Sequence, residues 1–255
     1  MCYDVSFSSS IELITDYLPE IEIENMPEFS FDLNVHVQAQ AYRKCGVILW
    51  EDGKYKFRFF EWGLIADYMQ SPESLRKYRP MMCNAQSEKV LGDTRSYWHR
   101  IRQQRCLIPV TGIYEHRHIA GWKKKVPYYV RLKNRELFCI PGLYQYSPIP
   151  DPETGELTGT FTMLTRKANI LMAQIHNGEP NAGRMPLFLP NREMELRWLD
   201  PRLTEVEMNG ILNFEIPSEE LIYHTVHTIR TTKPRPDEKY KNEFFEWPNL
   251  PAIEI

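Results

Sequence analysis

Apolar and polar residues alternate along several stretches of the chain, and this period of two predicts β-strands. From Phe31 to Ala39 the odd-numbered positions are apolar and the even-numbered ones mostly polar, as in a strand with one buried face. The stretches 45–50 and 55–60 flank Asp52-Gly53, which predicts a hairpin. Its outward face would carry Lys54, Lys56 and Arg58. Further strands are predicted at 106–114, 126–132, 137–144, 161–165, 185–189 and 221–228.

Helices are predicted where a polar capping residue precedes apolar positions spaced three or four apart. Ser8-Ser9-Ser10 would cap a short helix through Leu18, and Asn191 would cap one through Leu199. Other helices are predicted at 96–104, 167–175 and 204–213. The segment 147–159 is rich in proline, glycine and acidic residues, which indicates a surface loop.

The order of these elements indicates an α+β fold. The chain has no internal repeat, and its strands do not alternate regularly with helices, which disfavours a parallel doubly wound sheet. We expect a large, mostly antiparallel sheet curled into a partial barrel with peripheral helices. Residues 1–230 are expected to form a single domain, and residues 231–255 a tail that packs on it or extends from it.

The composition of the chain limits the cellular compartments in which we expect the protein. None of the 255 residues falls in an apolar run of about 18, so we expect no membrane partner. The first residues lack the basic and apolar regions of a signal peptide. Five cysteines without a Cys-x-x-Cys pair argue against a disulfide framework or a zinc ribbon and fit a reducing cytoplasm. We expect Cys45, Cys83, Cys106 and Cys139 to lie in the core.

The charge distribution is uneven. Residues 94–135 contain eleven lysines and arginines and one acid, Glu115, within a chain of formal charge −3. A basic face on an acidic protein is typical of a surface that binds a phosphate backbone. A scattered, solvated surface would have the same composition, so charge alone leaves both interpretations open.

Cys2 is the first candidate catalytic residue. If Met1 is removed, Cys2 carries a free α-amine beside its thiol, and both groups are partly in their nucleophilic forms near neutral pH. Such an aminothiol condenses with an aldehyde to an imine, which the thiol closes to a thiazolidine. A cysteine at this position without any function is the alternative.

Three other polar residues occupy places where a core strand would not need them. Asn84 offers a donor and an acceptor for a sugar hydroxyl, or it is a turn residue. Glu115 follows an apolar strand, where burial would raise its pKa and make it a general acid, unless it pairs with an arginine. His176 precedes a glycine at a helix end, as an acid–base group or as a cation on the helix dipole. His116 and His118 lack a third ligand, so we expect no metal site.

Five short motifs occur in an order that resembles the SRAP family (SOS-response-associated peptidase). They are Met1-Cys2, Trp62-Gly63, Asn84-Ala85, Gly112-x-Tyr114-Glu115, and Ile175-His176 with Arg184-Met185-Pro186. The resemblance extends from Cys2 to about Thr228. The chain departs from it where Met-Cys-Gly-Arg becomes Met-Cys-Tyr-Asp, with Asp4 in place of arginine. It departs again at Gln86 and His116, which replace an arginine and a tryptophan, and in the longer spacing over residues 177–183.

The resemblance implies a protein that covalently traps abasic sites in single-stranded DNA through a thiazolidine. It implies Cys2 as the nucleophile, Asn84 as the residue that positions the opened sugar, and Glu115 and His176 as proton-transfer groups. His176 would also act in crosslink reversal, and Met1 would be removed autocatalytically. The implied fold is a bifurcated sheet rolled into a pseudo-barrel. The resemblance also implies an apolar or stacking wall beside the DNA, formed by Trp62 and the Gly63 turn. Further predicted DNA contacts are Gln86, Arg95, Arg100, Arg102, Arg117 and Arg184.

On this interpretation the protein is a cytoplasmic monomer that joins the nucleoid on DNA damage and needs no cofactor or metal. Two other functions remain open from the sequence. One is an N-terminal-nucleophile amidohydrolase, in which the amine of Cys2 is a general base and its thiol attacks an amide. The other is a module that binds single-stranded DNA without a covalent bond, in which Cys2 has no role.

Overall fold

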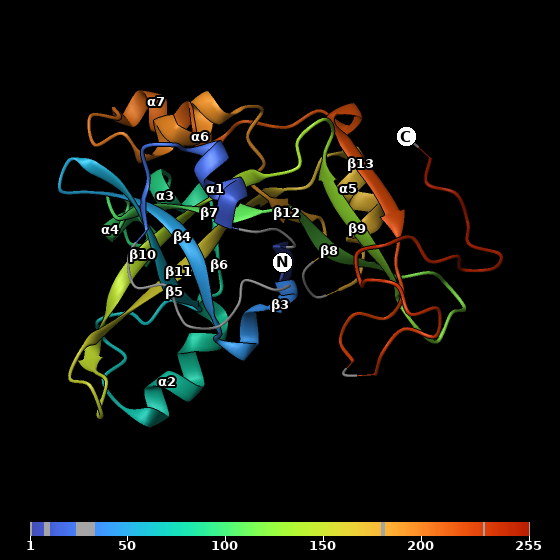
Figure 1. The fold of residues 1–255 in the computed structure, drawn as a ribbon, viewed down its shortest axis with the longest axis horizontal. Helices are drawn as coiled ribbons and strands as arrows, with labels where there is room; N and C mark the ends of the chain where they lie inside the picture. Colours follow the sequence, from blue (N-terminus) through green and yellow to red (C-terminus); the bar gives the residue numbers. More distant parts are fainter. Residues whose placement is uncertain (1, 8–10, 24–33, 180–181, 232, 255) are drawn as a thin grey trace.

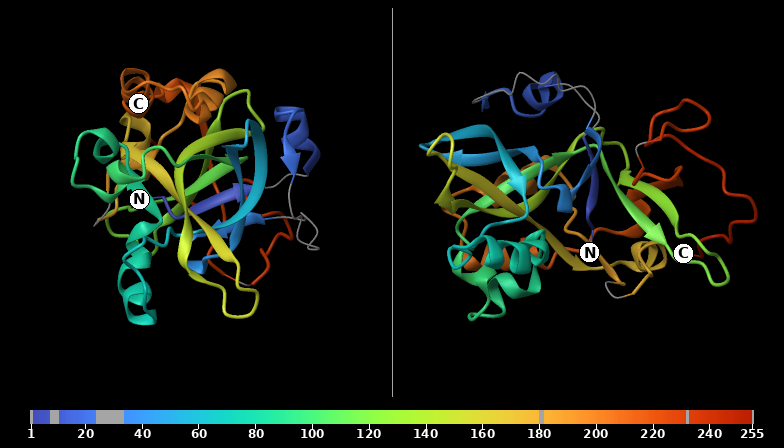
Figure 2. Two further views of the ribbon diagram at one scale, coloured as in Figure 1. Left: turned by 90° about the vertical axis from the view of Figure 1, so that its left-hand side faces the viewer. Right: turned by 90° about the horizontal axis from the view of Figure 1, so that it is seen from below.

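The computed structural model describes residues 2–7, 11–23, 34–179, 182–231 and 233–254. Within these ranges the chain forms two β-sheets surrounded by short helices (Figure 1). Figure 2 shows the two sheets beside one another, with the C-terminal segment on the far side of the second. The predicted α+β pseudo-barrel with peripheral helices is confirmed.

The first sheet contains a closed barrel of five strands. These are β4 (Lys44–Glu51), β5 (Lys54–Trp62), β7 (Arg105–Val110), β10 (Phe138–Pro150) and β11 (Leu157–Lys167). Neighbours are antiparallel except β11 and β5, which run parallel and close the barrel by pairing Phe161 with Trp62. Closure leaves these strands without a free edge at that position. Three short strands extend the sheet: β2 (Glu22–Ile23), β6 (Asn84–Gln86) and β12 (Arg184–Pro186).

The second sheet places the beginning of the chain in its interior. Its antiparallel strands, in spatial order, are β13 (Leu221–Thr225), β9 (Val126–Leu132), β8 (Gly112–Arg117), β1 (Asp4–Phe7) and β3 (Asn34–Gln38). In β1, Asp4 is paired with Tyr114 on one side and with Gln38 on the other. The N-terminal residues therefore form an internal strand of the second sheet, and the N-terminus lies near the middle of the molecule in the view of Figure 1.

The single strand predicted at 106–114 is two strands. β7 belongs to the barrel and β8 to the second sheet, and the chain passes between them at Thr111. The backbone N–H of Thr111 donates to the carbonyl of Ser6 at 2.8 Å, and its hydroxyl donates to the same oxygen at 3.2 Å. Apolar residues continue through the break, so the pattern could not locate it. The break places Glu115 on the second sheet.

The hairpin predicted around Asp52-Gly53 is confirmed. Both residues have positive φ, 53° and 79°, as a type I′ turn requires. The prediction that all three basic residues of β5 face water is wrong. Lys54 is exposed, but Lys56 is buried and pairs with Asp52, and Arg58 is half-buried beside Glu51.

The loop predicted at 147–159 is mostly strand. β10 and β11 remain paired as far as Pro150 and Leu157, so only the residues between them form the turn. Proline and glycine are tolerated here because the pairing is irregular beyond Tyr146.

The helices cover the outside of the sheets. They are α1 (Ile11–Tyr17), α2 (Pro72–Tyr78), α3 (Glu88–Leu91), α4 (Tyr97–Arg100), α5 (Ile170–Ile175), α6 (Arg192–Leu199) and α7 (Glu205–Leu212), with 3₁₀ turns at Ala39–Ala41, Arg79–Met82 and Ser218–Glu220.

Several predicted helices are confirmed and others are shorter than expected. Asn191 caps α6 by accepting from the Met194 N–H at 2.9 Å. The helix predicted at 96–104 ends at Arg100. Helix α2 escaped prediction because none of its residues is buried, which leaves no apolar stripe. The predicted cap at Ser8-Ser9-Ser10 and the start of the strand at 31–33 lie outside the described residues.

The C-terminal segment 233–254 packs against the second sheet. The Phe245 N–H donates to the carbonyl of Thr225 at 2.9 Å, and the Trp247 indole donates to the carbonyl of Val226 at 2.9 Å. Further along, the guanidinium of Arg117 donates to the carbonyls of Pro251 and Ala252. The division of the chain near residue 230 stays a prediction.

Gly46 allows the close packing of β4 against β5. A Cβ at this position would lie 2.1 Å from Cζ of the buried Phe57. We expect Gly46→Ala to lower the free energy of unfolding by about 2 kcal/mol through overpacking, measured by urea unfolding with tryptophan fluorescence. Gly210→Ala is the control, because it adds a methyl to α7 with no atom within 4 Å and should raise stability by about 0.5–1 kcal/mol. Equal effects of the two substitutions would contradict this account.

Candidate catalytic site and nucleic-acid interface

Cys2 lies just before β1 and is wholly buried, with 0% of its surface exposed. The adjacent Tyr3 carbonyl accepts from the Ala39 N–H at 2.8 Å, which fixes the backbone on this side. The Cys2 thiol donates to the carbonyl of Asp4, with Sγ and O 3.5 Å apart. Burial, reinforced by the nearby Glu115 carboxylate, raises the pKa of the thiol well above its usual value. In this environment the thiol is held protonated until a base takes its proton.

Glu115 extends from β8 toward Cys2 and is 4% exposed. Burial raises the pKa of its carboxyl group, although the neighbouring His176 opposes the shift. Its Oε2 lies 3.8 Å from Nε2 of His176, and its Oε1 has no hydrogen-bond partner among the described residues. The basic side chain beside Glu115 is therefore the imidazole of His176 and not one of the arginines of the basic segment. A buried carboxyl with a raised pKa can act as a proton donor near neutral pH.

His176 ends helix α5 and is 7% exposed. Its Nδ1 lies 2.6 Å from the carbonyl oxygen of Arg184 in β12. A carbonyl can only accept, so Nδ1 carries a hydrogen and Nε2 is the nitrogen directed at Glu115. His176 and Glu115 form a buried acid–base pair. The end of helix α5 positions the imidazole ring of His176.

Asn84 is the first residue of β6 and is 5% exposed. Both its side-chain oxygen and its side-chain nitrogen are buried without a hydrogen-bond partner among the described residues. Native structures rarely leave a buried amide unpaired, because each unpaired group costs about 1–3 kcal/mol. The position therefore suits a polar ligand. The sequence left open a turn role for Asn84, and the structure places it in a strand.

Asn84 and the Cys2 cluster lie in the same region. Cys83, its neighbour in sequence, packs in one apolar cluster with Cys2. Burial raises the pKa of the Tyr3 hydroxyl, and the proximity of Cys83, Cys2 and Glu115 adds to the shift. Tyr3 therefore lies close both to Cys83, the neighbour of Asn84, and to Cys2 and Glu115.

The predicted stacking role of Trp62 is not supported. The indole is 1% exposed, stacks on Phe161 at 6.0 Å and donates to the Cys83 carbonyl at 2.8 Å. A buried ring offers no face to a nucleotide base. Trp62 instead holds the backbone just before Asn84.

Most of the predicted DNA-binding arginines are engaged within the protein. Arg184 makes two bonds to the Glu88 carboxylate, and Arg117 binds carbonyls of the C-terminal segment. Arg100 pairs with Asp67 at 2.6 Å, and Arg102 with Glu205 at 3.3 Å. Arg95 is almost fully exposed, with the carboxylate of Asp93 3.9 Å away. Gln86 is half-buried at the end of β6.

The basic segment 94–135 does not form one face. It runs through α4 and β7 on the barrel and then through β8 and β9 on the second sheet (Figure 1). Two of its arginines are largely buried: Arg105 donates to the carbonyls of Trp198 and Asp200, and Arg135 binds Glu195 through two bonds. Local clustering in the sequence therefore overstated the positive surface.

Sequence reasoning missed a buried ionic cluster beside Cys2. Asp4 is 2% exposed, and its carboxylate binds Nε2 of His36 at 2.7 Å and the guanidinium of Arg230 at 2.5 and 3.1 Å. Asp4 stands where the resembling motif has an arginine, and that departure was the available signal. Its two partners come from β3 and from the segment after β13, so no local spacing could reveal them.

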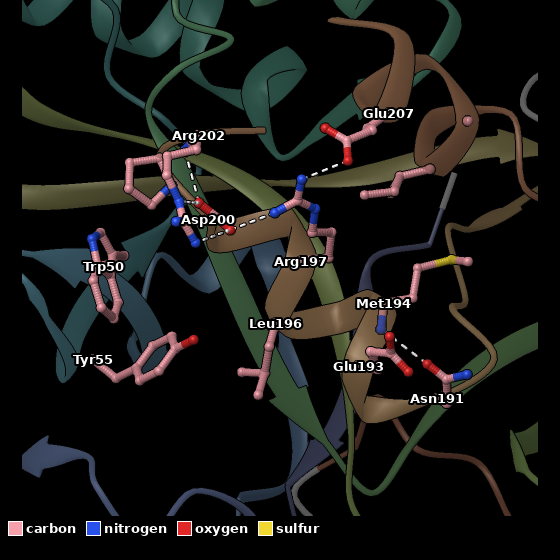
Figure 3. Close-up of a pocket in the computed structure, with 13 residues that line it drawn as sticks. Trp50, Tyr55, Asn191, Glu193, Met194, Leu196, Arg197, Asp200, Arg202 and Glu207 are labelled. Carbon is pink, nitrogen blue, oxygen red and sulfur yellow. Dashed lines mark hydrogen bonds and ion pairs between the residues drawn. The ribbon is translucent and has the colours of Figure 1, made fainter. Parts of the chain in front are cut away.

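A cleft of about 800 Å³ lies away from these residues, between helices α6 and α7 and the β4–β5 hairpin (Figure 3). Trp50, Tyr55 and Leu196 supply its apolar surface. Four of its five charged residues pair with one another: Arg197 binds Asp200 and Glu207, and Arg202 binds Asp200. None of the predicted catalytic residues lines this cleft.

The described ranges contain neither a metal-binding cluster nor a membrane-spanning helix. Among those residues, no three histidine, cysteine or acidic side chains are placed to hold a metal ion. Burial lowers the pKa of His116 to about 4. No helix in the described part of the chain has the length and apolarity to cross a membrane.

The arrangement of Cys2, Asn84, Glu115 and His176 can be compared with known families. A family model described as SOS response associated peptidase (SRAP) matches residues 1–230. The chain belongs to the SRAP family. The family resemblance that the motifs predict is thus confirmed over residues 1–230.

Three SRAP relatives are named abasic site processing proteins. YoqW of Bacillus subtilis is 33% identical over 144 residues, which are 56% of this chain and 57% of YoqW. YobE of the same bacterium is 32% identical over 168 residues, 66% of this chain and 69% of YobE. HMCES of chicken is 23% identical over 187 residues, 66% of this chain and 52% of HMCES. The chain thus spans little more than half the length of YoqW.

Two crystal structures share the fold. A protein from Bacteroides thetaiotaomicron superposes with a TM-score of 0.77 and 28% identity, covering 95% of this chain and 97% of that one. A protein from Bordetella bronchiseptica superposes with a TM-score of 0.69 and 20% identity, covering 89% and 100%. The second likeness concerns the fold alone.

Because Trp62 is a core residue, its replacement should affect stability rather than DNA binding. Trp62→Phe removes the bond to the Cys83 carbonyl and leaves a small void, so we expect a loss of about 2 kcal/mol in the free energy of unfolding. Affinity for a single-stranded oligonucleotide, measured by fluorescence anisotropy below the unfolding temperature, should be unchanged. Weaker binding by a variant of normal stability would restore the stacking role.

Asp4 should make stability depend on pH in the acidic range. Burial alone would raise the pKa of Asp4, but hydrogen bonds from His36 and Arg230 outweigh it and lower the pKa below the ordinary 3.8. The stabilisation is therefore present above that value and is lost as pH falls through the folded-state pKa. Asp4→Asn should lower the free energy of unfolding by about 3 kcal/mol at neutral pH. In urea titrations the difference in unfolding free energy between this variant and the wild type should become smaller below pH 3.8. A difference that does not change with pH would refute the assignment of this stabilisation to the ionised Asp4 carboxylate.

Proposed function

We propose that this SRAP protein processes abasic sites by trapping them covalently in single-stranded DNA through Cys2. The observation that carries the proposal is the convergence of a buried N-terminal cysteine with a buried acid–base pair, Glu115 and His176. Asn84 adds a buried amide without partners in the described structure. The names of the relatives YoqW and YobE support the same substrate class.

The proposed reaction begins after Met1 is released and the α-amine of Cys2 is free. The opened sugar of an abasic site presents an aldehyde at C1′, to which the amine adds to give a carbinolamine. Glu115, whose pKa is raised by burial, donates a proton to the hydroxyl that leaves as water. The product is an imine between the Cys2 nitrogen and C1′.

The thiol then closes the ring. Cys2 Sγ adds to the imine carbon, and its proton passes to the nitrogen, so one aldehyde and one aminothiol give a thiazolidine and one water with no change of oxidation state. Glu115 lies beside the thiol and His176 beside Glu115, which provides a route for this proton. Return of the proton from nitrogen to sulfur by the same pair would break the C–S bond and restore the imine, and addition of one water to the imine would release the aldehyde and reverse the crosslink.

Asn84 and the burial of the site account for selectivity in this proposal. The unpaired amide can bond to a hydroxyl of the opened sugar through both its oxygen and its nitrogen. A sugar without a base is small enough to approach buried groups, and a single strand avoids the cost of opening a base pair. The protein would act as a monomer in the cytoplasm, with Arg95 and Gln86 as DNA contacts.

Release of Met1 belongs to the same proposal. The Cys2 thiol would attack the Met1 carbonyl and displace the Cys2 nitrogen, which leaves as the free α-amine. Water would then hydrolyse the thioester to methionine and the thiol. Glu115 is placed to take and return the thiol proton. A general aminopeptidase would produce the same N-terminus.

The test uses protein with a free Cys2 and an end-labelled single-stranded oligonucleotide containing one abasic site. We expect a band that survives denaturation with the wild type, and none with undamaged DNA. Cys2→Ala keeps the α-amine but not the thiol, so it should give the band only when borohydride is added to reduce the imine. Glu115→Gln should slow the reaction by about 10²-fold or more. Cys45→Ala, which changes a half-buried cysteine of β4, is the matched control and should react normally.

The outcomes separate the alternatives. A non-covalent DNA-binding module would give salt-reversible binding, no denaturation-resistant band and no effect of Cys2→Ala. An N-terminal-nucleophile amidohydrolase would show glutaminase activity without the band. Absence of the band, with the free N-terminus verified by mass spectrometry, would reject covalent capture.

A further inference from the structure

Asp4 is a buried carboxylate with an unusually complete set of partners. It is 2% exposed and binds His36 from β3 and the guanidinium of Arg230 from the segment after β13. Three bonds to a carboxylate from two separate segments restrict both its position and its rotation. Arg230 itself is 44% exposed at its side chain, so the ionic cluster reaches from the interior to the surface.

The same residue contacts Cys2 directly. The carbonyl of Asp4 accepts the hydrogen bond of the Cys2 thiol, with Sγ and O 3.5 Å apart. The backbone of Asp4 is in turn fixed by its pairing with Tyr114 in β8 and Gln38 in β3. Asp4 therefore connects the thiol to the strand that carries Glu115 and, through its side chain, to β3 and Arg230.

The positive charge of Arg230 lies near the proposed catalytic residues. The hydrogen bond to Asp4 raises the pKa of Arg230, and the proximity of Glu115 and Cys2 adds to the shift. The cation of Arg230 is thus close to the reacting groups, although it comes from a residue 228 positions away from Cys2 in the sequence. Where the resembling motif has an arginine at position 4, this chain has an acid that holds an arginine from the other end of the matched segment.

We propose that Asp4 is the positioning residue of the Cys2 aminothiol, held in place by Arg230 and His36. The inference rests on the proposed function, because it concerns the geometry of the same nucleophile. Asp4 does not touch the DNA or the aldehyde in this assignment. It acts by keeping the Cys2 thiol beside Glu115.

The first experiment measures crosslinking of the abasic oligonucleotide under single-turnover conditions over a range of protein concentrations. Asp4→Asn keeps the size of the side chain and the backbone carbonyl but removes the charge that binds Arg230. We expect it to lower the maximum rate by roughly tenfold or more, because small displacements of a reacting group are costly, with half-saturation nearly unchanged. Arg230→Gln should have a similar effect, and Arg230→Lys should not restore the rate, since lysine cannot make the paired contacts. The double variant Asp4→Asn/Arg230→Gln should be no slower than the slower single variant.

Glu195→Gln is the matched control for a general loss of stability. Glu195 is also a fully buried carboxylate bound by an arginine, Arg135, through two bonds, but it belongs to α6 and lies outside the Cys2 cluster. The Glu195→Gln variant should be less stable to thermal unfolding. At a temperature where it is folded, it should crosslink DNA at the wild-type rate. Equal loss of rate in Asp4→Asn and Glu195→Gln at equal stability would overturn the proposal, as would an effect of Asp4→Asn on half-saturation alone.

A second readout does not require DNA. The Cys2 thiol is fully buried, so alkylation by iodoacetamide, followed at Cys2 by peptide mass spectrometry, should be slow in the wild type. Asp4→Asn should increase this rate several-fold at Cys2 but not at the equally buried Cys106 and Cys139, whereas a loss of folded protein would increase it at all three. An unchanged alkylation rate in folded Asp4→Asn would overturn the proposal even if the wild type failed to crosslink DNA, so the two hypotheses fail separately.

Discussion

The parallel pairing of β5 with β11 is the interaction on which the rest of the structure depends. It closes the barrel at Trp62 and Phe161, and the buried indole of Trp62 then binds the Cys83 carbonyl. That bond fixes the backbone immediately before Asn84, while Asn84 itself is in register with Met163 of β11. The barrel is therefore the support that holds an unpaired amide in a buried position, where it would otherwise rotate toward water.

The site places polar groups where the protein gains no stability from them. Asn84 has two buried atoms without partners among the described residues, and Glu115 has one. In proteins such groups are tolerated at positions where a ligand completes the bonding. Glu195, which is also buried, is fully bonded to Arg135 and Tyr17. Glu195 therefore stabilises the fold, whereas Glu115 is available for chemistry.

The sequence predicted the parts of the fold that depend on local physics. The hairpin at Asp52-Gly53 needs positive φ at adjacent residues, and the cap at Asn191 needs one side-chain oxygen, so both could be recognised from neighbouring residues. The break at Thr111 could not, because apolar residues continue through it and only the bond to Ser6, distant in sequence, defines it.

The same distinction holds at the site. Cys2, Asn84, Glu115 and His176 were identified by residue type and order. The structure brings Cys2, Glu115 and His176 together, and Asn84 follows Cys83, which belongs to the same apolar cluster as Cys2. The pairing of Asp4 with Arg230, the burial of Trp62 and the internal partners of Arg117 and Arg184 depend on tertiary contacts that no spacing encodes. The basic segment was misleading for the same reason, since its residues are distributed over two sheets.

The internal position of β1 in the second sheet has a consequence for when the site can form. On the ribosome Cys2 is made before β8, which pairs with β1 and is complete only at Arg117, and His176 and Arg230 follow much later. Contacts of such long sequence separation form late in folding. A nascent chain therefore carries its N-terminal cysteine apart from the acid and the imidazole that surround it in the native state. The chemistry proposed for this residue would become available only after Arg230 has been synthesised and the second sheet has folded.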